Sequence, residues 1–189
     1  MELLAGNESQ ESWVKKLDSG TEPQLWGLWS SAPFVWKERS TQARHIVFSR
    51  LAELNPDWLA SDKFDILFRR SDQGEQVALL KLLPLLNQPE LYEQTAVESL
   101  RTNSLSVFSA IAFDNSYPND YLPEHHFNHL ILKSFFMGLN GGLVVGAQER
   151  LSQQLLQMLN DYVSELSIAG RELPDGLKSY RDYVLEKLS

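Results

Sequence analysis

The chain has 189 residues, a net charge of −8 and no cysteine. A length of this order suits one domain. The lack of cysteine excludes disulfide bonds and thiolate metal sites, and the acidic balance argues against sequence-independent binding of nucleic acid. Because no apolar run approaches the ~20 residues of a membrane span and no signal-peptide pattern opens the chain, we expect a cytoplasmic protein without a membrane span.

Apolar residues recur with a helical period through the first half of the chain, and no segment alternates as a strand would. Thr21 is a suitable N-cap with Pro23 in the turn behind it, and Asn55-Pro56 should end a helix. Residues 55–68 have no clear assignment. The helices expected here are 9–18, one that begins at Thr21, 41–54 and 74–86.

The second half continues the helical pattern. Asp114–Pro123 reads as a loop, because Asp, Asn, Ser and Pro favour turns, and Gly141-Gly142 marks a break. The expected helices are 89–101, 104–113, 124–138, 147–168 and one from Pro174 to the end. Short turns between consecutive helices predict one all-α domain over residues 1–189, either a HEAT-like helical-pair superhelix or an irregular helical bundle.

Five tryptophans lie in the first third of the chain. Buried aromatic rings usually belong to a core or to the interface of a helix pair, and this is the interpretation we favour. The alternative is a groove for a lipophilic metabolite or a partner helix. The residues are Trp13, Trp26, Trp29, Trp36 and Trp58.

Asn128 is the most informative polar residue, because it falls inside the apolar arc of the 124–138 helix. A buried amide costs a few kcal/mol unless it is hydrogen-bonded. In one interpretation Asn128, helped by Glu124, holds the 114–118 loop in place. In the other, a polar pocket is lined by Asp114, Asn115, Tyr117, Glu124 and Asn128.

Lys133 and Arg101 are candidates to bind an anion such as a phosphate or carboxylate, since both supply charge-assisted donors. Alternatively, Lys133 extends along apolar surface to reach water. Arg101 would then belong to an ordinary helix end, with Asn103 or Ser104 capping the next helix.

Three of the four histidines lie within five residues. His125 and His129 are spaced i,i+4, as in metal-binding helices, but His126 stands where the HExxH motif has glutamate. We therefore expect a solvated helix face, no metal and no cofactor. Glycine-rich phosphate loops, a G-x-S-x-G elbow and a cysteine nucleophile are all absent from the sequence.

Several segments together resemble the EboA family. They are LLPLL at 82–86, RTNSLSVFSAIAFDNSYPNDYLPE at 101–124, the F-N-x-L-x-L-K pattern at 127–133 and AGRELP at 169–174. The resemblance covers residues 70–174, and residues 1–69 share only a helical, apolar character. Phe127 stands where the family usually has tryptophan, His129 where it has glutamine, and Ser116 where proline is common.

The resemblance implies a bacterial, α-helical, cytoplasmic protein that acts with other products of a secondary-metabolite or export gene cluster. We expect a non-catalytic scaffold or carrier that binds a lipophilic, for example prenylated, precursor or a partner protein of the cluster. The alternative is an enzyme for an anionic small molecule, with Glu124 as general base and Lys133 or Arg101 holding the anion.

Overall fold

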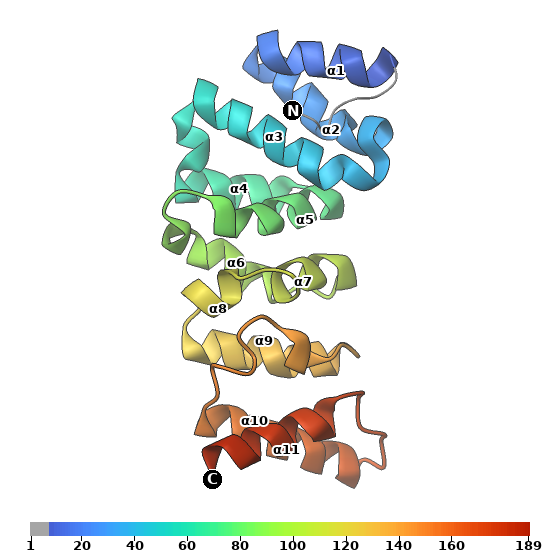
Figure 1. Ribbon diagram of the computed structural model, residues 1–189, viewed down its shortest axis with the longest axis vertical. Coiled ribbons are helices and arrows are strands. Elements are labelled where there is room, and N and C mark those ends of the chain that lie inside the picture. The colour runs from blue at the N-terminus through green and yellow to red at the C-terminus, as the bar shows by residue number, and fades with distance from the viewer. Residues whose placement is uncertain (1–7) are drawn as a thin grey trace. The chain divides into compact units, whose positions relative to one another are not determined.

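The computed structural model describes residues 8–189, and every regular element within them is a helix (Figure 1). The all-α prediction is confirmed. The chain divides into two compact units, Met1–Leu82, described from Glu8 onwards, and Leu83–Ser189. The single domain and the HEAT-like superhelix remain predictions. Each helix of the described residues is too short or too polar to cross a lipid bilayer.

The N-terminal unit is built around the helix pair α2 and α3, with α1 packed on α2 and α5 packed on α3 (Figure 1). Thr21 is the N-cap residue of α2, and its backbone N–H donates a hydrogen bond to Gln24 Oε1 at 2.8 Å. The α-helices are α1 (Glu8–Ser19), α2 (Glu22–Trp36), α3 (Ser40–Leu54), α4 (Ser61–Arg70) and α5 (Gln73–Leu82), with 3-10 turns η2 (Lys37–Arg39) and η3 (Pro56–Leu59).

The segment that had no clear assignment contains η3 and α4. The Asn55 side chain accepts a hydrogen bond from the Asp57 N–H at 3.2 Å, which starts the 3-10 turn after α3. In α4 the buried residues are only Phe64 and Phe68. In the sequence, Ile66 and Leu67 are apolar as well, so the four apolar residues of this stretch show no clear one-sided helical pattern.

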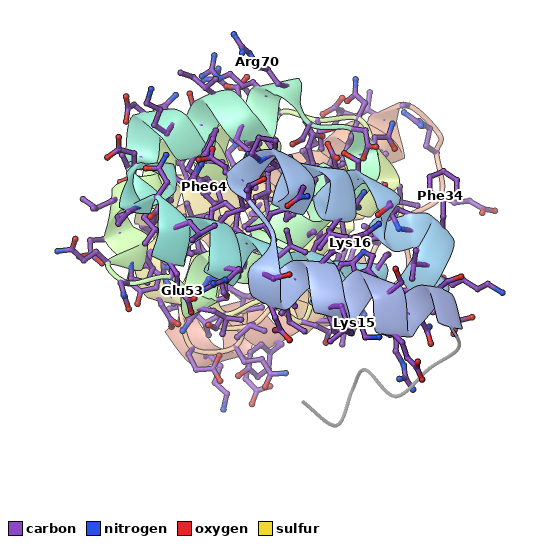
Figure 2. All side chains as sticks on the ribbon, turned by 90° about the horizontal axis from the view of Figure 1, so that it is seen from above. Lys15, Lys16, Phe34, Glu53, Phe64 and Arg70 are labelled. Carbon is purple, nitrogen blue, oxygen red and sulfur yellow. The ribbon has the colours of Figure 1, made fainter. Side chains whose placement is uncertain are left out.

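The tryptophans belong to the core of the N-terminal unit, as the favoured interpretation predicted. Trp13, Trp29 and Trp36 are buried. Trp26 and Trp58 are half-buried and pack edge-to-face with centroids 4.9 Å apart. By contrast, Phe34 near the end of α2 is 85 % exposed and lies at the periphery of the unit (Figure 2).

In the C-terminal unit, α9 follows α7 and α8 along the chain and precedes α10 and α11. After α9 the chain returns across that helix through η6, so that α10 begins at the same end of the unit as α9 (Figure 1). The α-helices are α6 (Glu93–Ser99), α7 (Leu105–Ala112), α8 (Tyr117–Tyr121), α9 (Glu124–Phe136), α10 (Gln153–Ile168) and α11 (Leu177–Leu188), and the 3-10 turns are η4 (Leu83–Leu85), η5 (Pro89–Tyr92) and η6 (Gly141–Leu143).

The expected loop at 114–123 is partly wrong, because it contains the short helix α8. Pro118 lies in the first turn of α8, where its missing N–H leaves no intrahelical bond unmade. Tyr117 and Pro118 are both buried. Turn-forming residues therefore mark where the chain reverses on either side of α8, while burial of one aromatic ring orders the helix between them.

Three expected helices are shorter than predicted. The 74–86 helix ends as α5 at Leu82 and continues as η4, since Pro84 lacks the N–H that an α-helix needs. The 89–101 helix opens as a 3-10 turn before α6. The 147–168 helix begins only at Gln153, because Ser152 is the N-cap: its Oγ accepts from the Leu155 N–H at 3.1 Å.

Candidate functional site

Two polar residues at the α7–α8 connection, Asn115 and Tyr117, form hydrogen bonds within the C-terminal unit. The Asn115 side chain is buried; its Nδ2 donates to the Ala110 carbonyl at 2.9 Å and its Oδ1 accepts from the Tyr117 N–H at 3.0 Å. The Tyr117 hydroxyl donates to the Pro89 carbonyl at 2.8 Å, and burial raises its pKa far above the usual value. Asp114 is exposed, with a φ of 48°. These contacts join α7, α8 and η5.

Asn128 is fully buried, as its position in the apolar arc predicts, but its partner is a different one. Its Nδ2 donates to Ser152 Oγ at 3.1 Å, the same oxygen that caps α10. The prediction that Asn128 and Glu124 hold the 114–118 segment is therefore wrong. Asn128 joins α9 to the start of α10, and Glu124 is exposed in the first turn of α9, where its charge favours the helix dipole.

Arg150 holds the stretch just beyond the 114–118 segment that Asn128 was predicted to hold. Its guanidinium donates to the carbonyls of Pro118, Asn119 and Leu122, each at 2.8 Å. The same group lies 4.3 Å from the centre of the Phe127 ring. The sequence carries no signal for this role, because the expected 147–168 helix would have placed Arg150 among ordinary helical residues.

The Asn128 geometry predicts a small effect for Asn128→Leu. The substitution removes one hydrogen bond to Ser152 but also removes Oδ1, which is buried and has no hydrogen-bond partner. Each of these opposing effects is about 1 kcal/mol, so we expect the free energy of unfolding to change by less than about 1 kcal/mol. Urea denaturation measures this change.

Ser152→Ala is the comparison variant. It removes the same hydrogen bond and also the N-cap of α10, so it should lower the free energy of unfolding by about 1 kcal/mol. A loss above about 2 kcal/mol for Asn128→Leu would contradict this account.

Lys133 is held at the end of α6. Its Nζ donates to the carbonyls of Leu100 at 2.6 Å and Thr102 at 2.7 Å, and it lies 5.5 Å from the centre of the Phe108 ring. Burial lowers the pKa of the ammonium group. The ion pairs of residues 8–189 do not include Lys133. Two of its three N–H groups therefore bind backbone oxygen, and its charge has no carboxylate partner.

Arg101 and Asn103 belong to an ordinary helix end, as the alternative interpretation proposed. The Arg101 side chain is 74 % exposed and forms an i,i+3 ion pair with Glu98 at 3.3 Å. Asn103 is exposed, and the N-cap of α7 is Ser104, whose Oγ accepts from the Val107 N–H at 3.5 Å.

A cavity of about 280 Å³ opens between α9 and α10, and Lys133 contributes to its wall. We call it the α9–α10 cavity; its lining residues are His129, Leu132, Lys133, Phe136, Tyr162 and Glu165. The four α9 residues are spaced i, i+3, i+4 and i+7 and so share one helix face. That face was predicted to be a solvated polar stripe. Two apolar residues on the same face, Leu132 and Phe136, were the only indication in the sequence that this face lines a cavity.

The histidines of α9 are the next candidate residues. His125 and His129 are exposed, and the rings of His125 and His126 lie 3.9 Å apart. Burial lowers the pKa of His126, and the neighbouring His125 lowers it further. Within the described part of the chain, no three His, Asp or Glu side chains are placed to share a metal ion.

The comparisons with known proteins agree with the resemblance seen in the sequence. The family model described as "Metabolite traffic protein EboA" matches residues 13–180. The match therefore extends over most of the N-terminal unit, beyond the 70–174 region in which the shared motifs are visible by eye. No curated protein and no solved structure matches the chain.

Proposed function

Because the chain belongs to the EboA family, we propose that it is a non-catalytic accessory protein, a scaffold or carrier in the cytoplasm. It binds a lipophilic metabolite, or a partner protein encoded in the same secondary-metabolite or export gene cluster. The observation that carries this proposal is the α9–α10 cavity, which combines apolar and polar walls on two helices of the matched region. A concave site with a few polar groups is the usual form of a small-molecule site.

The alternative, an enzyme, has less support from the positions of its residues. A general base must lie within hydrogen-bond reach of its substrate in a site that excludes water. Glu124 is exposed in the first turn of α9 and does not line the α9–α10 cavity. Asn115 and Tyr117 bind backbone groups of their own unit. The contacts of these side chains therefore favour binding without turnover.

Native mass spectrometry of the protein purified from its own host tests the proposal. We expect the protein to retain a small molecule or a cluster-encoded protein in a defined stoichiometry. Prolonged incubation should release the small molecule with unchanged mass. A heat-denatured sample, which should retain nothing, is the control. Conversion of the retained molecule on the protein, or the absence of any retained species, would contradict the proposal.

A further inference from the structure

We propose that the α9–α10 cavity binds a small amphiphile with a single carboxylate, which pairs with the ammonium group of Lys133 while the apolar part lies against Leu132 and Phe136. This inference rests on the proposed small-molecule binding and adds the site and the chemical class of the ligand. Four observations support it: the unpaired charge of Lys133, the charge balance of the cavity, its apolar wall and its size.

The Lys133 ammonium is positioned before any ligand arrives. Two of its N–H groups are fixed by the carbonyls of Leu100 and Thr102. Its third N–H remains for another acceptor, since an ammonium group has three donors. Burial disfavours the charged form of Lys133, as its lowered pKa indicates, and no carboxylate of residues 8–189 forms an ion pair with it. An incoming carboxylate would supply both the missing acceptor and the missing countercharge.

The charges around the cavity favour one negative charge on the ligand. Lys133 and Glu165 line the cavity. Burial raises the pKa of Tyr162, and the nearby Glu165 raises it further. The nearby Arg171 acts in the opposite direction and lowers it. Arg171 is not part of the lining, so the lining carries one cation and one carboxylate. A monoanion can pair with the ammonium group of Lys133, whereas a dianion would meet the repulsion of Glu165.

The apolar wall explains why the ligand should be an amphiphile and not an inorganic anion. Phe136 is 71 % exposed, although it lines the cavity with Leu132. A ligand that covers a large aromatic ring beside a concave site removes apolar surface from water, which favours binding. Tyr162 also lines the cavity, and its hydroxyl, like that of any tyrosine at neutral pH, can donate a hydrogen bond to the ligand.

The size of the cavity suits a small ligand. Its volume of about 280 Å³ lies just below the roughly 300–1,000 Å³ that is usual for small-molecule sites. A ligand of roughly ten non-hydrogen atoms fits this space, and a longer apolar chain would extend past Phe136 into solvent.

Three probes that differ only in the head group test the charge preference: 3-phenylpropanoate, 3-phenylpropan-1-ol and 3-phenylpropylamine. Isothermal titration calorimetry with the full chain should show the acid binding about tenfold or more tighter than the alcohol, because one charge-assisted hydrogen bond contributes at least that factor. The amine should show no binding at the same concentrations. Equal binding of acid and alcohol, or no binding of the acid at millimolar concentration, would overturn the proposal.

Two substitutions test the location. Lys133→Met should reduce the affinity for the acid to that of the alcohol, and Lys178→Met on the exposed face of α11 should leave it unchanged. Because Lys133 also binds two backbone carbonyls, its loss could disturb the fold, so a second variant is needed. Phe136→Glu changes an exposed side chain at the cavity and should abolish binding of the acid. The matched control is Phe34→Glu, which changes an exposed phenylalanine of the N-terminal unit.

The same variants separate this inference from the proposed function. If Phe136→Glu binds the acid as the wild type does, the α9–α10 cavity is not the site, and the inference fails. If Phe136→Glu purified from the host still carries the metabolite that the wild type carries, metabolite binding stands and this site is again excluded. If the wild type carries no metabolite but the acid binds with the expected head-group order, the site is supported while the carrier role is not.

Discussion

Replacement of Arg150 by methionine should destabilise the protein by about 2–4 kcal/mol. The guanidinium satisfies three carbonyls, those of Pro118, Asn119 and Leu122, in a partly buried position. Each hydrogen bond to a charged group contributes about 1.5–3 kcal/mol where water cannot replace it, and partial access of water reduces the sum. Methionine keeps much of the apolar contact with Phe127 but donates to none of the three oxygens.

The unfolding of Arg150→Met must be followed with a probe that reports on the C-terminal unit, where Arg150 lies. All five tryptophans lie between residues 13 and 58, so their fluorescence reports on the N-terminal unit alone. Far-UV circular dichroism during urea denaturation follows the helices of both units and is the suitable probe. Arg101→Met is the matched control, because its exposed ion pair with Glu98 should contribute less than about 1 kcal/mol. Equal stability of Arg150→Met and Arg101→Met would show that the three carbonyl contacts do not hold α8.

Replacement of Gly141 by alanine should destabilise the protein by about 2–3 kcal/mol. Gly141 is buried in η6, where the chain crosses α9. A Cβ atom there would lie 2.6 Å from the Ile131 carbonyl oxygen and 2.7 Å from the Phe135 ring. Contacts this short force the backbone of η6 away from α9, since a carbonyl oxygen within a helix cannot turn aside.

Gly27→Ala is the control for the effect of adding a methyl group. Apart from the adjacent residues and the local backbone of α2, nothing lies within 4 Å of the Cβ that alanine would add at this position. Alanine is the better helix former there, so Gly27→Ala should raise stability by about 0.5–1 kcal/mol. Thermal unfolding of both variants gives the comparison. A melting temperature for Gly141→Ala equal to that of the wild type would mean that η6 does not pack tightly on α9.

The hydrophobic pattern of the sequence predicted the elements whose stability comes from local interactions and simple burial. Thr21 begins α2, Asn55-Pro56 ends α3, and the three tryptophans Trp13, Trp29 and Trp36 are buried. Asn128 was correctly placed in the interior. These predictions succeed because a cap, a proline and the periodicity of apolar residues act over a few residues and need no knowledge of the partner.

The candidate site could be predicted only in part. Lys133 was singled out from the sequence, and it lines the α9–α10 cavity, but Tyr162 and Glu165 come from α10, about thirty residues further along the chain. Nothing in the local pattern of α10 distinguishes these two side chains from other polar residues of an amphipathic helix. Their position beside Lys133 follows from the return of the chain across α9.

The sequence alone determined that the described chain is helical, where several helices begin and end, and which residues are apolar enough to be buried. The tertiary structure determined the partners of the polar residues: Ser152 for Asn128, the α8 carbonyls for Arg150, and the Leu100 and Thr102 carbonyls for Lys133. The physical reason is range. Helix formation and burial depend on neighbours along the chain, whereas a side-chain hydrogen bond between segments more than twenty residues apart forms only when packing brings a donor and an acceptor within about 3 Å.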